Sequence, residues 1–140
     1  MLPKQWRNRL LIKSKFMVKG VFVENIPFIS VVVGWGRSVQ SSFFILDTGF
    51  TGDLQITPKT AQELGLKIVG VTKTRVANGQ TIQVPVALAI ASMEDAVNYV
   101  QVMISESMPL AGISFLTKFG YKAIVDCKYR NVILEKPINL

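Results

Sequence analysis

Short runs rich in Val, Ile, Phe and Thr alternate along this chain with residues that favour turns. This pattern is typical of β-strands, and no strong helical repeat accompanies it. Strands are expected at residues 17–24, 28–35, 42–47, 67–77, 80–90, 97–104, 121–126 and 130–135. The hydrophobic pattern therefore predicts a mostly β chain with low helix content.

Two hairpins are predicted from the turn residues between these strands. Asn78-Gly79 separates two strand-like runs, and this dipeptide favours a type I′ turn because both residues tolerate positive φ. A second hairpin is expected to turn at residues 128–131. We further expect strand 130–135 to pair with its copy in a second chain, which would cover an edge otherwise left open.

Two short helices complete the predicted fold. Thr57 can cap a helix that has Pro58 at its first position and ends at Gly65, an arrangement that suits both helix ends. A second helix is expected from Ile113 to Phe119, with Gly120 closing it, because glycine tolerates the left-handed conformation found there.

Composition and charge divide the chain into two parts. Its length of 140 residues and apolar content of 49% suit a single domain with a core. The net charge is +7, and residues 1–19 hold six Lys or Arg and no acid, whereas the rest holds ten basic and nine acidic residues. Residues 1–19 are therefore expected to be a solvated, partly flexible basic arm; an anionic partner, nucleic acid or lipid, is the alternative.

Several chemistries are excluded by the residues that are missing. The chain has one cysteine and no histidine, so an internal disulfide and a Ser-His-Asp or Cys-His mechanism are excluded within one chain. A zinc site of the usual kind is not expected either. Carboxylates, lysines and tyrosines remain for acid–base chemistry. We find no convincing secretory signal or membrane span, and so expect a cytoplasmic protein.

One stretch combines a buried strand with reactive groups. Residues 43–52 read FFILDTGFTG, which places Asp47, a hydroxyl and two glycines where an apolar run ends. Aspartate and glycine are common turn residues, so the tripeptide alone is weak evidence of chemistry. Residues 108–116, MPLAGISFL, add a second apolar run that ends in Ala-Gly before a predicted helix. The chain thus has, in order, a strand that ends in Asp-Thr-Gly, a short helix, a hairpin with a glycine tip, an apolar run that ends in Ala-Gly before a helix, and final strands.

This ordered set resembles the retropepsin-like (clan AA) aspartic proteases, in particular the small stand-alone prokaryotic members with an Asp-Thr-Gly-Phe loop. Residues 45–66, ILDTGFTGDLQITPKTAQELGL, are the most specific part, and the resemblance extends from about residue 26 to residue 134. It implies a retropepsin-like closed β-barrel or sandwich over residues 20–140, with half an active site per chain. The resemblance also implies a homodimer that hydrolyses peptide bonds in a peptide or protein substrate.

The resemblance gives each residue of the loop a role. Asp47 would face Asp47 of a second chain, and two carboxylates so close share one proton. One carboxylate then activates a water while the other donates to the peptide carbonyl, without metal or cofactor. Thr48 resembles the threonine that holds the two loops in register, and Gly49 lets the backbone turn tightly beside the carboxylate.

Substrate contacts are implied for Phe50 and for the hairpin residues Ala77, Asn78 and Gly79. The hairpin tip would be a flap that closes over substrate, where glycine permits motion and close backbone approach. Phe50 departs from the alanine or serine of many retroviral relatives, so a narrowed or reshaped groove is expected. The flap also lacks the run of glycines seen in viral enzymes.

Ala111 and Gly112 are implied to pack beneath the active loop, where small side chains let the chain cross. Ser114 departs from the acid or amide that relatives often have two residues after the glycine. It is expected to cap the following helix.

The remaining polar residues are given structural roles. Asp53 and Asp126 are interpreted as turn residues, Asp53 being solvated beside Gly52. Cys127 is expected to be a packed or surface thiol, because the sequence offers no base to activate it.

Two alternative functions stay open. The first is a dimeric binding module that keeps the fold with little or no protease activity. The departures from the family pattern at Phe50 and Ser114 are compatible with it. The second is a nucleic-acid-associated protein that acts through the basic arm and therefore binds more weakly as salt rises. Nucleic-acid binding is not expected of residues 20–140, where charges nearly balance.

Overall fold

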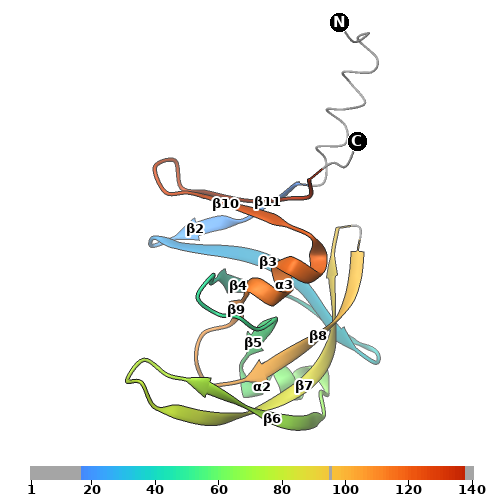
Figure 1. The fold of residues 1–140 in the computed structure, drawn as a ribbon. Coiled ribbons are helices and arrows are strands. Elements are labelled where there is room, and N and C mark those ends of the chain that lie inside the picture. The colour runs from blue at the N-terminus through green and yellow to red at the C-terminus, as the bar shows by residue number, and fades with distance from the viewer. Residues whose placement is uncertain (1–16, 95, 138–140) are drawn as a thin grey trace, which may run out of the picture.

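Strands dominate the structure of this protein, a computed structural model that describes residues 17–94 and 96–137 (Figure 1). Residues 1–16 of the predicted basic arm lie outside the described residues, and Met17–Lys19 form the first strand. No helix in the described part of the chain has the length and apolar character needed to cross a membrane.

The described residues form eleven strands and two helices. The strands are β1 (Met17–Lys19), β2 (Val21–Val23), β3 (Ile26–Trp35), β4 (Ser38–Leu46), β5 (Leu54–Ile56), β6 (Ile68–Arg75), β7 (Thr81–Met93), β8 (Ala96–Ile104), β9 (Leu110–Ala111), β10 (Lys122–Asp126) and β11 (Asn131–Glu135). The helices are α2 (Pro58–Leu64) and α3 (Ile113–Phe119).

The larger sheet has the strand order β2-β3-β4-β9-β5-β8-β7-β6, and an additional pairing of β3 with β7 joins six of these strands into a ring. The short strand β9 lies between β4 and β5, parallel to the first and antiparallel to the second. Strands β1, β11 and β10 form a separate three-stranded sheet beside β2 and β3 (Figure 1).

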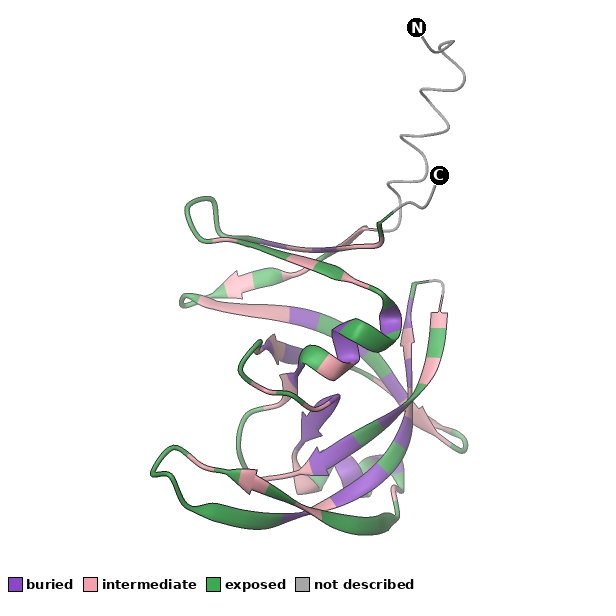
Figure 2. Cartoon of the chain, viewed as in Figure 1, coloured by how far each residue is buried: buried purple, intermediate pink, exposed green. Residues whose placement is uncertain are grey.

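The buried residues of the core lie on the strands of this ring, on both helices and on β11 (Figure 2). On β3, Ile29, Val31 and Val33 are at most 1% exposed, as expected for alternate residues that face one side of a strand. Helix α3 contributes Phe115 and Phe119, whose ring centroids lie 4.8 Å apart. These buried side chains hold α3 against the core, where the helix contacts β8.

The predicted helices agree closely with the structure. Helix α2 begins after Thr57, whose hydroxyl accepts a hydrogen bond from the N–H of Thr60, and ends at Gly65 with φ of 69°. Helix α3 ends at Gly120, also at φ of 69°. The predicted capping role of Ser114 is wrong, because Gly112 is the N-cap residue and no side chain caps this end.

The hairpin between β6 and β7 is present, but the predicted type I′ turn is wrong. Gly79 has φ of 84° whereas Asn78 does not have positive φ. The N–H of Val76 donates to Gln80 O, and that of Gly79 to Val76 O, both at 2.9 Å, as in a three-residue loop. The side chain of Asn78 accepts from the N–H of Gln80 at 2.9 Å, which stabilises this alternative geometry.

Positive φ at two successive residues occurs instead at Glu24 and Asn25, with φ of 50° and 65°. They join β2 to β3, where Val23 pairs with Ile26, so this loop has the conformation of a type I′ turn. The side chain of Arg130 donates to Asn25 Oδ1 at 2.7 Å. That bond links this turn to the predicted second hairpin, which turns between β10 and β11.

The expectation that strand 130–135 pairs with its copy is also wrong. Strand β11 lies in the middle of its sheet, with β1 on one side and β10 on the other. Its backbone groups are therefore used within the chain, and the edge that the sequence left open is covered by residues 17–19.

The buried ring of Phe115 should dominate the stability of α3. Phe115→Ala should lower the free energy of unfolding by about 3–5 kcal/mol, because a fully buried aromatic side chain leaves a cavity. Tyr99→Ala, at a side chain that is 66% exposed, should change it by less than about 0.5 kcal/mol. Urea unfolding of both variants measures the difference, and equal losses would contradict the assigned core.

Candidate active site

Asp47 is held by backbone hydrogen bonds where β4 ends. The N–H of Ile45 donates to Pro109 O at 2.9 Å and that of Asp47 to Ala111 O at 3.0 Å, which continues the parallel ladder. Beyond it the chain turns back at once: Gly49 N–H donates to Asp47 Oδ1 at 2.9 Å, and Phe50 N–H donates to Asp47 O at 3.1 Å. The carboxylate is therefore fixed relative to the strand, while Thr48 and Gly49 are exposed.

The segment after β9 lies directly against this loop. Gly112 N–H donates to Asp53 O at 2.9 Å, and Ile113 N–H donates to Phe50 O at 2.8 Å. A Cβ atom at Gly112 would overlap the carbonyl oxygens of both Phe50 and Gly52. Ala111 is fully buried, so both small residues lie where the chain crosses beneath the loop.

A groove of about 470 Å³ separates the loop from the β6–β7 hairpin. Four of the residues singled out from the sequence line it, namely Asp47, Gly49, Phe50 and Ala77. The other lining residues are Gln55, Thr74, Arg75, Val76, Ile82, Val84, Ser105, Ser107 and Leu110. Asn78 and Gly79 form the exposed hairpin tip and do not line the groove, and neither does Thr48.

Phe50 connects the loop to the strands that form the hairpin. Its half-buried ring packs against the buried cluster of Val84, Val86 and Met103. The same ring covers Gly52, where a Cβ would lie 2.6 Å from the ring edge. The aromatic side chain thus forms an apolar part of the wall of the groove that Asp47 also lines.

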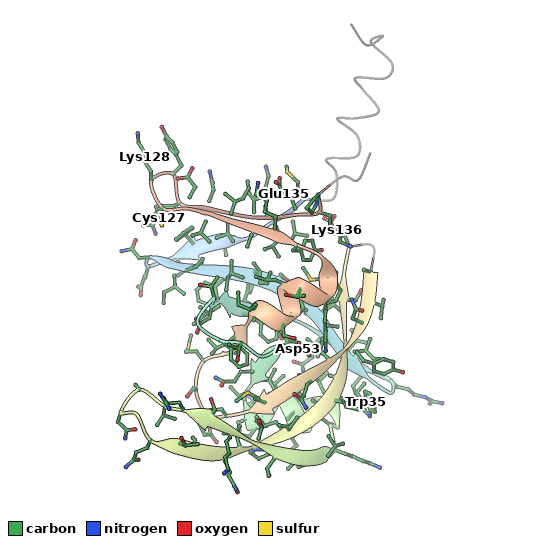
Figure 3. The ribbon with its side chains drawn as sticks, in the orientation of Figure 1. Trp35, Asp53, Cys127, Lys128, Glu135 and Lys136 are labelled. Carbon is green, nitrogen blue, oxygen red and sulfur yellow. The ribbon has the colours of Figure 1, made fainter. Side chains whose placement is uncertain are left out.

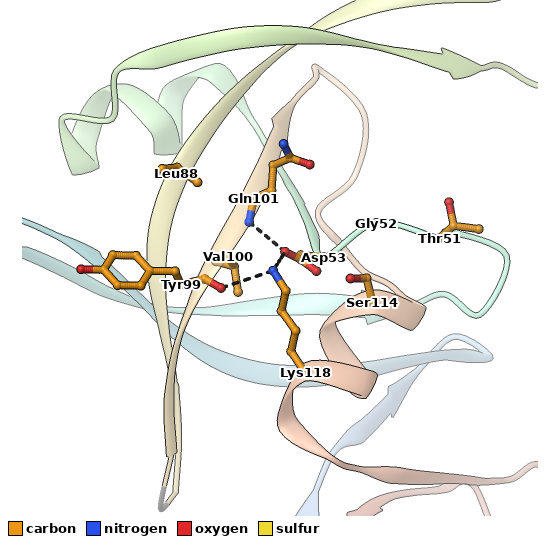
Figure 4. Close-up of a pocket in the computed structure, with 9 residues that line it drawn as sticks. All are labelled: Thr51, Gly52, Asp53, Leu88, Tyr99, Val100, Gln101, Ser114 and Lys118. Carbon is orange, nitrogen blue, oxygen red and sulfur yellow. Dashed lines mark hydrogen bonds and ion pairs between the residues drawn. The ribbon is translucent and has the colours of Figure 1, made fainter.

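The interpretation of Asp53 as a solvated turn residue is wrong. It is 4% exposed, and its Oδ2 accepts from Lys118 Nζ at 2.6 Å and from Gln101 N–H at 2.8 Å. These partners come from α3 and β8, as Figure 4 shows, and Figure 3 places Asp53 in the interior of the molecule. Gly52 and Asp53 follow each other in the sequence, as residues of a turn often do. The cation that pairs with Asp53 is Lys118, which lies 65 positions further along the chain.

The ion pair between Lys118 and Asp53 holds the far end of the loop that begins at Asp47. Lys118 Nζ also contacts Tyr99 O at 3.4 Å, so the ammonium joins α3 to β8 as well as to Asp53. The carboxylate is almost fully enclosed, and its Oδ1 has no partner among the described residues. An enclosed carboxylate needs a counter-charge, so the loop position depends on Lys118.

The other polar residues singled out have simpler surroundings. Asp126 Oδ1 accepts from Tyr129 N–H at 3.0 Å, as predicted for a turn residue. Cys127 is exposed at the same turn, where Figure 3 shows it beside Lys128. Within the described residues, no three His, Cys, Asp or Glu side chains gather as metal ligands do.

The crossing at Gly112 predicts a stability loss from one methyl group. Gly112→Ala should lower the free energy of unfolding by about 1–3 kcal/mol, because the added Cβ meets two carbonyl oxygens that cannot move independently. Gly70→Ala is the matched control, since nothing lies within 4 Å of its Cβ position. Thermal or urea unfolding compares the two, and an unaffected Gly112→Ala would contradict the close crossing.

Removing the Lys118 charge should also destabilise the loop. Lys118→Met leaves the Asp53 carboxylate enclosed without its counter-charge, which should cost about 1–3 kcal/mol of unfolding free energy. Lys122→Met is the control, because its 3.7 Å pair with Glu135 is largely solvated and should be worth less than about 1 kcal/mol. If both variants unfold alike in urea, the ion pair does not hold the loop.

A scan against protein-family models and a search of the curated proteins find no match to this chain. What distinguishes the groove is one carboxylate on a loop fixed by backbone hydrogen bonds, facing a hairpin across a lining of mixed polar and apolar residues.

Proposed function

We propose that this protein is an aspartic endopeptidase, in which two chains of retropepsin-like fold each supply one Asp47. The observation that carries the proposal is the position of Asp47 in the groove between the loop and the hairpin. A peptide in extended conformation fits such a groove, where it can bond to strand backbones on either side.

The groove chemistry supports a carboxylate mechanism over the others. Asp47 is the only acid among the described residues that line the groove, and Arg75 is the only base. Hydroxyls are present at Thr74, Ser105 and Ser107, but the chain has no histidine to activate them. A carboxylate that acts on a water molecule is the chemistry that these residues can support.

One Asp47 is insufficient for this reaction, so the proposed enzyme is a homodimer. Related by a two-fold axis, two Asp47 side chains share one proton, because two neighbouring carboxylates cannot both ionise. The ionised one removes a proton from water, and the protonated one donates to the carbonyl oxygen of the scissile bond. Thr48, exposed at the loop, is proposed to bond across the axis and align the two loops.

The hairpin is proposed to close over the bound peptide. Ala77 lines the groove, while Asn78 and Gly79 lie at the exposed tip, where few contacts restrain their motion. Closure excludes water other than the reacting one and brings backbone groups to the substrate. Phe50 would then contact a substrate side chain next to the scissile bond.

Asp47→Asn should abolish peptide cleavage. The amide cannot act as a base, so cleavage of a mixed peptide library between pH 4 and pH 7 should fall at least about 1000-fold. Glu94→Gln is the control for loss of one negative charge, because Glu94 is exposed and lies outside the groove. Its cleavage rate should match the wild type.

Concentration adds a second test of the same proposal. Wild-type activity should rise more steeply than linearly with protein concentration until the dimer is saturated, because no single chain has a complete site. Cleavage that persists in Asp47→Asn would refute the mechanism. A folded dimer that cleaves nothing in the library would instead favour a binding module built on the same groove.

A further inference from the structure

Among the described residues, the outer face of β2, β3 and β4 is an exposed apolar surface. Strand register places Val21 opposite Phe28, and Phe28 opposite Ile45. It likewise places Val23 opposite Ile26 on the same pair of strands. Directly opposed residues of antiparallel strands lie on the same side of the sheet. Their neighbours in sequence, such as Ile29 and Phe44, face the core instead.

Large side chains on this face are accessible. Val21, Val23 and Phe43 are 45%, 53% and 58% exposed. A hollow of about 290 Å³ lies among them, and the described residues that line it are these three and Phe28. Contiguous exposed apolar surface of this kind marks interaction sites in soluble proteins.

The face carries no charge. Strands β2, β3 and β4 contain no Lys, Arg, Asp or Glu, and residues 20–140 as a whole hold ten basic and nine acidic residues. A partner recognised through its charge therefore finds no counter-charge on these strands. A second copy of the chain finds no like charge on them either, so charge does not oppose its approach here.

Asp47 lies at the end of this same face. Phe43, Ile45 and Asp47 are alternate residues along β4 and its continuation, and the ladder to β9 extends through Asp47 N–H. Alternation places them on one side of the strand. Whatever covers Phe43 and Ile45 therefore approaches the carboxylate.

We infer that this apolar face, formed by Val21, Val23, Phe28, Phe43 and Ile45, is the surface on which a second copy of the chain docks. The inference rests on the proposed function, because a site with one Asp47 is incomplete and a second copy is the partner that brings another. A two-fold contact uses the same patch on both chains, so an interface that includes Ile45 lies beside both aspartates. Strand β11 is not available for this contact, since both of its edges are paired within the chain.

Phe43→Asp tests this inference, with Val97→Asp as the matched control. Both side chains are strongly exposed, at 58% and 65%, so neither change should disturb the folded chain. In a two-fold interface Phe43→Asp introduces two carboxylates that become enclosed, which should raise the dimer dissociation constant at least about 100-fold. Val97→Asp, on β8, should leave the constant within about threefold of wild type.

Sedimentation of full-length wild type and both variants over a range of concentrations measures these constants, with peptide cleavage followed in the same samples. The inference is supported if Phe43→Asp sediments as a folded monomer at concentrations where wild type is dimeric, and regains cleavage when concentrated. A Phe43→Asp dimer as tight as wild type overturns the docking face and leaves the proposed protease intact. A wild type that stays monomeric and inactive at every concentration overturns both.

Discussion

The structure depends on the close crossing of two chain segments at Gly112. Strand β9 lies between β4 and β5, and Gly112, which follows it, packs against the loop that carries Asp47 just before α3 begins. No side chain fits there, because the carbonyl oxygens of Phe50 and Gly52 occupy the space of a Cβ. Backbone hydrogen bonds from Asp47 to Ala111 and from Gly112 to Asp53 then join both ends of the loop to this segment.

Two further contacts hold the loop that carries Asp47. Asp53 joins the far end of the loop to β8 and α3 through Gln101 and Lys118. Phe50 packs on the base of the hairpin, against Val84 and Val86, whereas Asn78 and Gly79 at the hairpin tip are exposed. The carboxylate is thus held on a fixed support, and the proposed closure over a peptide would require motion of the hairpin tip alone.

The sequence predicted the long elements better than the short ones. Alternation and capping residues identified β3, β7, β8 and both helices, because each extends over enough residues to show a period or an end signal. Strands β5 and β9 have three and two residues, too few for any periodicity. Their positions are set by pairing with strands distant in the chain, which local pattern does not encode.

The same limit applies to the candidate site. Asp47 could be singled out from its place at the end of an apolar run, and Phe50 and Ala77 from the resemblance of their segments to a known family; all three line one groove. Asp53 was misassigned because its burial is created by β8 and α3, and neither its turn-like neighbours nor its spacing from Asp47 signals a lysine 65 positions away. Contacts between distant segments, which decide whether a carboxylate is solvated or enclosed, are visible only in the folded chain.

Charge distribution connects the groove to the face of the sheet beside it. Three strands without a charged residue lead to the carboxylate of Asp47. A neutral apolar surface offers a second copy of the chain no like charge, whereas two Asp47 carboxylates brought together repel each other unless they share a proton. In the proposed dimer the burial of apolar area would offset that cost, so association and formation of the site would be one event.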